Sequence, residues 1–206
     1  MNHYFTNERL ESKIKKVLIK IEDKTFTFNT DLGVFSKKGL DFGSRTLINA
    51  LLKENLTGDL LDVGCGYGVI GIILSTFFSL NCDMVDVNKR AVHLSCMNIK
   101  ENKVSDKVMA FESNIYDKVT KKYDYIVTNP PIRAGKNIVY KILFDAKEHL
   151  KNNGTLYYVV NKNQGALTTK KDLEKIADVK LIDKNKGFYV FKVKFNWQIA
   201  LLVLLI

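Results

Sequence analysis

The chain has little of what marks several common classes of protein. Its three cysteines are scattered among 206 residues, without the spacing of a zinc site and in an odd number that does not suit a disulfide framework. No run of about 20 apolar residues could span a bilayer, and residues 1–5 do not begin an apolar signal segment. Low-complexity tracts and solenoid-type repeats are also missing. We therefore expect a globular, cytoplasmic protein without a metal site or a membrane span.

What the chain does have is enough apolar sequence for a core, and a basic charge. Hydrophobic residues make up 46% of it, which suits one sizeable domain, expected over residues 1–195. The net charge of +10 fits a polyanionic partner such as nucleic acid or a membrane surface. A compositional bias toward Lys, Asn and Ile would produce the same charge. Residues 196–206 form an apolar tail that is too short to cross a bilayer, and its role stays open.

Strand-like and helix-like segments alternate along most of the chain, which predicts an α/β fold with helices on both faces of a mostly parallel sheet. A β-hairpin over residues 13–30 is expected within an N-terminal extension (1–40), followed by a Rossmann-like core (41–195). The last two strands are joined by a short turn and must be antiparallel, so we expect seven strands with an antiparallel last one. The expected strands are 60–63, 82–87, 108–111, 123–128, 156–160, 179–182 and 188–195, and the expected helices are about 45–54, 69–78, 89–102, 139–150 and 165–175.

A glycine-rich loop joins the first core strand to its helix. Gly64, Gly66 and Gly68 let the backbone turn tightly and approach a ligand closely. The following helix presents free N–H groups and the positive end of its dipole. Gly66, Gly68 and Gly71 also satisfy the dinucleotide fingerprint, with Asp86 near the spacing of its ribose-binding acid. The loop alone therefore leaves an NAD enzyme open.

Polar side chains at the strand ends favour S-adenosylmethionine over a dinucleotide. Asp62 precedes the glycines, where it would repel a pyrophosphate and attract the ammonium group of S-adenosylmethionine. Asp86 ends the second strand and would accept hydrogen bonds from both ribose hydroxyls, while Asn114, after the third strand, would accept one from the adenine amino group. Alternatively, Asp86 caps the next helix and Asn114 is an ordinary turn residue.

The chain's only two prolines are adjacent and directly follow the fourth strand, in the turn from Asn129 to Ile132. An exocyclic amine is a poor nucleophile, because its lone pair is delocalised. The side-chain oxygen of Asn129 and the backbone carbonyl of Pro130 would bind its two N–H groups, aim the lone pair and stabilise the positive charge that develops on nitrogen. The ring of Pro130 fixes this geometry. The turn therefore predicts methyl transfer to a planar amino group.

The residues that follow the first proline are expected to contact the substrate. Pro131 belongs to the same turn, and Ile132 would pack on one face of the flat group. Arg133 and Lys136 are placed to meet phosphate, although a solvated loop would look the same.

Taken together, these stretches resemble the 16S ribosomal RNA guanine-N2 methyltransferases of the RsmC type, within the class I methyltransferases. The resemblance implies the Rossmann-like class I fold, S-adenosylmethionine as cofactor, and guanine N2 in ribosomal RNA or the 30S subunit as target. It also implies that Gly43 and Ser44 help close the cofactor site. Longer members carry an additional N-terminal domain, and here we expect the catalytic part alone. The matching stretches are residues 4–5, 33–36, 40–45, 62–68, 113–116 and 129–136, and the likeness extends to about Phe195.

Three alternatives stay open. Protein glutamine-N5 methyltransferases use the same chemistry, but their turn is normally Asn-Pro-Pro-Tyr, where this chain has Ile132. Adenine-N6 methylation is a further variant. A noncatalytic RNA-binding module would keep the fold and lose the ligand residues, yet Asp62, Asp86 and Asn129 are all present. As an RNA surface we expect the basic face of the hairpin, with Lys13, Lys15, Lys16 and Lys20.

Overall fold

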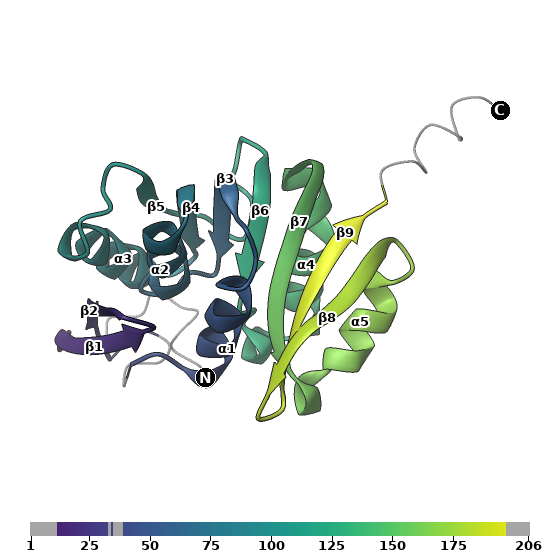
Figure 1. The fold of residues 1–206 in the computed structure, drawn as a ribbon, viewed down its shortest axis with the longest axis horizontal. Helices are drawn as coiled ribbons and strands as arrows, with labels where there is room; N and C mark the ends of the chain where they lie inside the picture. The colour runs from purple at the N-terminus through teal and green to yellow at the C-terminus, as the bar shows by residue number, and fades with distance from the viewer. Residues whose placement is uncertain (1–11, 33, 35–38, 197–206) are drawn as a thin grey trace.

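The computed structural model describes residues 12–32, 34 and 39–196 (Figure 1). The resemblance at residues 4–5, 33 and 35–36 and most of the apolar tail lie outside this part of the chain. Within it, no helix is both long and apolar enough to cross a membrane. The same part holds no group of three or more His, Cys, Asp or Glu side chains that could bind a metal ion.

The predicted seven-stranded sheet is confirmed, with strand order β5-β4-β3-β6-β7-β9-β8. The pairs from β5 to β7 are parallel, and β9 is antiparallel to both of its neighbours. Because the parallel strands run the same way, their carboxyl ends meet at one edge, at the bottom of Figure 1. The strands are β3 (Thr57–Val63), β4 (Ser79–Asp86), β5 (Val108–Glu112), β6 (Tyr123–Thr128), β7 (Leu150–Asn161), β8 (Ala177–Asn185) and β9 (Phe188–Phe195).

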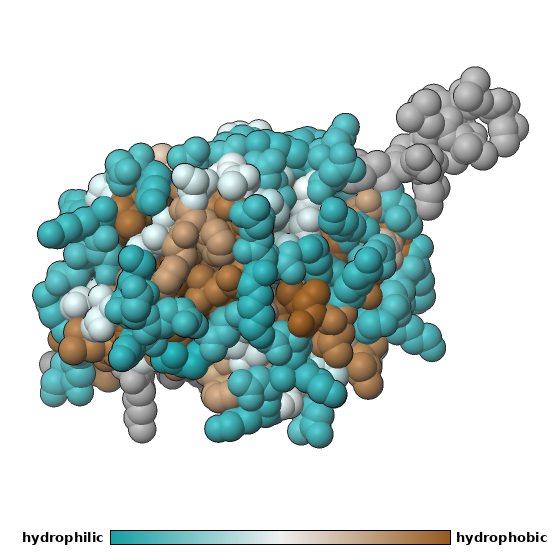
Figure 2. All heavy atoms as spheres, viewed as in Figure 1, coloured by the Kyte–Doolittle hydropathy of each residue, from teal (hydrophilic) through white to brown (hydrophobic). Residues whose placement is uncertain are grey.

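Helices cover both faces of the sheet, and each face has its own apolar cluster. One cluster joins α1, α2 and α3 to the sheet, and the other joins α4 and α5 to the opposite face. Figure 2 shows the first face, where hydrophilic side chains surround hydrophobic ones that remain visible near its middle. The helices are α1 (Phe42–Leu51), α2 (Val69–Phe77), α3 (Lys89–Glu101), α4 (Lys136–His149) and α5 (Ala166–Leu173), with short 3-10 helices η2 (Ile132–Ala134) and η3 (Lys162–Gln164).

The N-terminal hairpin is also confirmed, as a separate two-stranded sheet of β1 (Lys15–Ile21) and β2 (Lys24–Thr30). Its apolar face packs on the first cluster, where the ring of Phe28 meets that of Tyr67 edge-on at 5.8 Å. The buried amide of Asn98, on α3, then fixes the hairpin. Its oxygen accepts from the backbone and side-chain N–H groups of Asn29, and its nitrogen donates to the Asn29 and Tyr67 carbonyls. One side chain thus ties the hairpin to the loop that precedes α2.

Several boundaries differ from the prediction. Strand β7 begins at Leu150, six residues before the predicted start at Leu156, and its pairing with β6 is irregular between Leu150 and Thr155. Polar residues therefore continue the pairing beyond the buried apolar run that signalled the strand. Helix α1 begins at Phe42, because Asp41 accepts a hydrogen bond from the backbone N–H of Ser44 and caps it there.

Candidate functional site

The glycine loop lies between the carboxyl ends of β3 and β4. The backbone N–H of Gly64 donates to the Val85 carbonyl at 2.9 Å, which ties the loop to β4. Both Gly64 and Gly66 have positive φ, and a Cβ atom on either would meet nothing within 4 Å. At Gly68 a Cβ would instead lie 3.0 Å from the side chains of Met84 and Ser95. The first two glycines therefore border open space, and the third allows close packing of α2.

Asp62 sits beneath this loop as a buried carboxyl group with one satisfied oxygen. Its Oδ2 accepts a hydrogen bond from the backbone N–H of Gly71 at 3.0 Å. Its Oδ1 is buried and has no hydrogen-bond partner within the described residues. Burial, with the nearby charge of Asp86, raises the pKa of Asp62 to about 7. A buried acid with one unsatisfied oxygen suits a cationic ligand group.

Asp86 connects the end of β4 to the glycine loop. Its Oδ2 accepts from the backbone N–H of Gly66 at 2.9 Å, and its Oδ1 accepts from that of Asn88 at 2.8 Å. Helix α3 is capped by Asn88, whose side chain accepts from two N–H groups of the first turn. Burial raises the pKa of Asp86 to about 6. A carboxylate has about four acceptor sites, so its two bonds leave capacity for ligand hydroxyls.

Asn114 is exposed in the turn after β5. Its side-chain N–H donates to the Asp117 carboxylate at 3.0 Å, a bond that leaves the amide oxygen available as an acceptor. The turn is tied to the neighbouring strand, because the backbone N–H of Ser113 donates to the Asp86 carbonyl. Ile115 has a φ of 53°, an uncommon conformation for a β-branched residue and one that no local residue pattern predicts.

The orientation of the Asn129 amide follows from its two partners. Its Nδ2 donates to Asp41 Oδ1 at 3.1 Å and to Ser44 Oγ at 3.0 Å. Because a carboxylate can only accept, the amide nitrogen must face Asp41 and the amide oxygen must face away from it. Asp41 caps α1, and its contact with Asn129 was not predicted. Local patterns could not reveal a pair 88 residues apart.

The two prolines shape the turn that follows Asn129. The backbone N–H of Ile132 donates to the Pro130 carbonyl at 2.9 Å, and Pro131 lies between them with φ −74° and ψ 80°, an inverse γ-turn. This bond uses one of the two acceptor positions of the Pro130 carbonyl. Ile132 is half-buried and packs against the core cluster that contains α4.

A hydrogen bond between strand ends brings the Asn-Pro-Pro turn beside the glycine loop. The hydroxyl of Thr128, the residue before Asn129, donates to the Val63 carbonyl at 2.8 Å, and Val63 directly precedes Gly64. The structure thus places the turn and the loop side by side, as expected for strand ends in a parallel sheet.

The remaining predicted residues lie around this centre. Gly43 packs against the Phe188 ring, which a Cβ atom would approach to 3.0 Å. Arg133 and Lys136 are exposed, and the ammonium group of Lys136 lies 4.7 Å from the centre of the Tyr140 ring. On the hairpin, Lys13, Lys15, Lys16 and Lys20 are all exposed, and Lys16 forms an ion pair with Glu101 at 2.9 Å.

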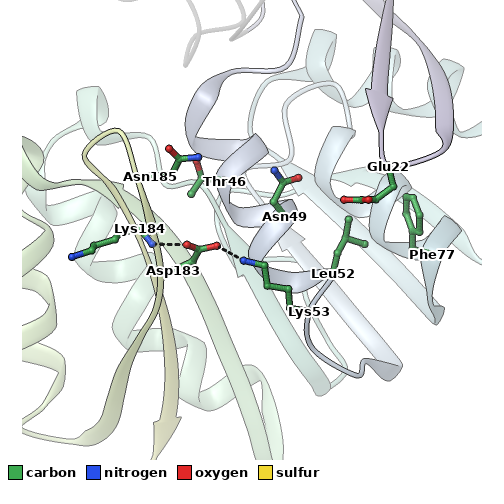
Figure 3. A pocket seen from close by; sticks show the side chains of 9 residues that line it. All are labelled: Glu22, Thr46, Asn49, Leu52, Lys53, Phe77, Asp183, Lys184 and Asn185. Atoms are coloured by element: carbon green, nitrogen blue, oxygen red, sulfur yellow. Dashed lines mark hydrogen bonds and ion pairs between the residues drawn. The ribbon is translucent and has the colours of Figure 1, made fainter.

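A hollow of about 660 Å³ opens elsewhere, over the outer side of α1 between the two β-hairpins (Figure 3). Phe77 and Leu52 form its apolar part, and an ion pair between Lys53 and Asp183 crosses its other side at 3.0 Å. None of the predicted site residues lines it. This hollow is therefore separate from the predicted site at the strand ends.

Residues 25–192 match the family model of the methyltransferase small domain. The chain belongs to this family. A similar member is the uncharacterized protein YbxB of Bacillus subtilis (strain 168), which is 42% identical over 93% of this chain and 98% of that protein. Ribosomal RNA small subunit methyltransferase C of Vibrio parahaemolyticus is 33% identical over 73% of this chain and 45% of that protein. The chain thus spans less than half the length of this second relative.

Solved structures show the same fold. The T. thermophilus 16S rRNA guanine-N2 methyltransferase RsmC, in complex with AdoMet and guanosine, superposes with a TM-score of 0.77 and 22% identity. It is matched over 92% of this chain and 52% of that one. The ribosomal protein L11 methylase of Lactobacillus delbrueckii gives a TM-score of 0.67 at 14% identity. The architecture is therefore that of the Rossmann-like methyltransferases.

Proposed function

We propose that this chain transfers a methyl group from S-adenosylmethionine to the N2 amino group of a guanine in 16S ribosomal RNA. The observation that carries the proposal is the Asn129 amide, whose oxygen is aimed away from Asp41 and Ser44 beside an open glycine loop. The family assignment supports methyl transfer, and the names of the RsmC relatives support guanine as the target.

The residues of the loop fit S-adenosylmethionine, which when bound supplies an activated methyl group on a positively charged sulfur. The unsatisfied oxygen of Asp62 would hold the ammonium group, and Asp86 would accept from the ribose hydroxyls. The free oxygen of Asn114 would accept from the adenine amino group. Gly64 and Gly66 leave the space that such a ligand needs. Gly68 lets the loop pack closely against the side chains of Met84 and Ser95. Gly43 and Ser44 would help close the site.

The Asn-Pro-Pro turn would hold the target amine. Asn129 Oδ1 and the second acceptor position of the Pro130 carbonyl would bind its two N–H groups, aim the nitrogen lone pair and stabilise the developing positive charge. As the N–C bond forms and the S–C bond breaks, the nitrogen becomes acidic and its extra proton passes to water. Pro131 and Ile132 would flank a flipped-out base, while Arg133 and Lys136 would meet phosphate. Such a role belongs in the cytoplasm, with the 30S subunit as partner.

Methyl transfer to 30S subunits from a strain that lacks the gene tests the proposal. Labelled cofactor should yield N2-methylguanosine at one site, mapped by mass spectrometry, and Asn129→Ala should reduce the rate by about 100-fold or more, the range reported for loss of one charge-stabilising group. Release factor, tested in parallel, would carry the label if the enzyme were a glutamine methyltransferase. Label on adenine, or cofactor binding without transfer to either substrate, would also overturn the proposal.

A further inference from the structure

A second, smaller hollow lies beside the turn between β8 and β9, and we call it the β8–β9 hollow. It has a volume of about 280 Å³. It is lined by Lys162, Lys184, Asn185, Lys186, Gly187 and Tyr189. Three of these six residues are lysines and none is acidic. This composition differs from that of the larger hollow in Figure 3, where acidic and basic side chains mix.

The β8–β9 hollow lies at the same edge of the sheet as the proposed active site. The backbone N–H of Lys162, just after β7, donates to the Gly187 carbonyl at 2.8 Å, and the β8–β9 turn lies at the bottom edge in Figure 1. Phe188, the next residue, packs against Gly43, and the neighbouring Ser44 accepts a hydrogen bond from Asn129. A continuous chain of contacts therefore connects the hollow to the predicted amine-binding turn.

The charge of this hollow is not neutralised by the protein. None of Lys162, Lys184 and Lys186 forms an ion pair with a carboxylate in the described part of the chain, and all three are exposed. Exposed lysines elsewhere do find such partners, as Lys53 does with Asp183 and Lys175 with Asp172. Three unneutralised ammonium groups around one depression favour a polyanion.

The conformation of Lys186 adds an independent observation. Lys186 and Gly187 form a two-residue hairpin loop in which both have positive φ, 44° and 83°. Asn, Asp or Gly is the usual choice at the first of these positions, because a lysine there strains the backbone. The ammonium group of Lys186 lies 5.1 Å from the centre of the Phe42 ring, so the strained turn holds this cation at a fixed place on the rim of the basic hollow.

Tyr189 adds an aromatic ring to the lining of the hollow. It is half-buried, and its ring meets that of Phe191 edge-on at 6.3 Å. Aromatic side chains among cations are typical of surfaces that bind single-stranded nucleic acid, since bases stack on the rings while phosphates meet the charges.

We propose that the β8–β9 hollow binds the RNA backbone next to the target base, with Lys162, Lys184 and Lys186 on its phosphates and Tyr189 against a neighbouring base. This inference rests on the proposed function for the identity of the target, but RNA binding can be measured without methyl transfer. The hollow, rather than the lysine face of the N-terminal hairpin, is then the principal RNA surface.

Binding of a single-stranded RNA oligonucleotide, followed by fluorescence anisotropy over a range of salt concentrations, tests the inference. Each lost phosphate contact reduces the salt slope by about 0.7, so K162Q/K184Q/K186Q should lower it by about 2. Extrapolated from 1 M salt, that change predicts a Kd on the order of 100-fold higher at 0.1 M. The control variant K171Q/K175Q/K180Q removes the same charge from three exposed lysines on and near α5, and it should change the salt slope little.

Lys186→Asn separates binding from folding. Asparagine suits the turn better than lysine, so the variant should unfold at a higher temperature while its Kd for RNA rises about 5-fold at 0.1 M salt. A purely structural role for Lys186 would not give these opposite changes.

The possible outcomes distinguish the inference from the proposed function. Equal salt slopes in wild type and K162Q/K184Q/K186Q would overturn the inference, as would a larger effect from K15Q/K16Q/K20Q on the N-terminal hairpin. Preference for an acidic peptide over RNA at the hollow would also overturn it. If RNA binding depends on the hollow and yet 30S subunits are not methylated, the inference stands and the proposed function falls.

Discussion

Replacing Asp62 by asparagine should make the ligand-free protein relatively more stable at alkaline pH and impair cofactor binding. The carboxyl group is buried, and burial with the charge of Asp86 raises its pKa from 3.8 to about 7. The folded protein therefore holds this proton more tightly than the unfolded chain does. Its contribution to stability is fully present below pH 4 and is lost as the pH rises through 7. Asparagine does not titrate, so the variant should not show this loss.

The size of the effect follows from the shift in pKa. A shift of about 3 units corresponds to about 4 kcal/mol at high pH. Between pH 5 and pH 8, the free energy of unfolding of wild type relative to Asp62→Asn should fall by about 2.5 kcal/mol. For a chain of this length that corresponds to roughly 5–10 °C in Tm. Asp86 titrates in both proteins, so most of its contribution cancels.

Two measurements check this prediction. Urea unfolding of both proteins at pH 5, 6, 7 and 8 gives the difference in stability. Calorimetric titration with S-adenosylmethionine at pH 7, in two buffers of different ionisation enthalpy, gives the protons released. Asp62 is about half protonated at that pH, and an ammonium partner would ionise it. Wild type should therefore release about half a proton more than Asp62→Asn does.

The results can refute the reasoning at two separate points. Parallel pH profiles of stability for the two proteins would mean that Asp62 has no raised pKa in the folded state. A pH-dependent difference without additional proton release would mean that the buried acid is present but does not face the ammonium group. The second result would leave the fold intact and remove Asp62 from the proposed cofactor site.

Three further predictions follow from other contacts of the site. Asp41→Ala should lower kcat for methyl transfer by about 10-fold or more without changing the Kd for cofactor, because it removes one of the two groups that orient the Asn129 amide; an equal rise in that Kd would contradict this. Asn98→Ala should lower the free energy of unfolding by about 3 kcal/mol in urea titration, since it leaves several buried polar groups unpaired. A loss below about 1 kcal/mol would mean that the Asn98 amide does not hold the hairpin in place. Gly64→Ala should weaken cofactor binding in calorimetry while lowering stability by only about 1 kcal/mol, because the new methyl group meets ligand space rather than protein; unchanged affinity would show that the space is not used.

Sequence patterns predicted the element types well, because each core strand is a short apolar run and each helix has an apolar face. They placed boundaries less well where pairing continues through polar residues, as in β7, which starts at Leu150. Asp62 and Asp86 could be proposed as site residues from the sequence because they stand at the carboxyl ends of β3 and β4, next to the glycine loop.

Long-range partners could not be read from the sequence. Asp41 carries the local signature of a helix cap, and nothing near it in the chain indicates that the same oxygen also orients Asn129. Asn98 lies on a helix without any local motif, although its amide joins two segments of the fold. Such roles depend on which surfaces meet after folding, and a pattern of a few residues carries no information about that.

The hydrogen bonds of the Asn98 amide have a consequence for the order in which the protein assembles during synthesis. The hairpin residue Asn29 is made 69 residues before the amide that fixes it. At about 5–20 residues per second, the hairpin waits on the order of 3–14 s for its partner. A lone two-stranded hairpin is at best marginally stable, and the aromatic partners of Phe28 and Phe26, which are Tyr67 and Phe77, are themselves made 39 and 51 residues later. The first part of the described chain to leave the ribosome thus cannot reach its native place until about half of the chain has been made.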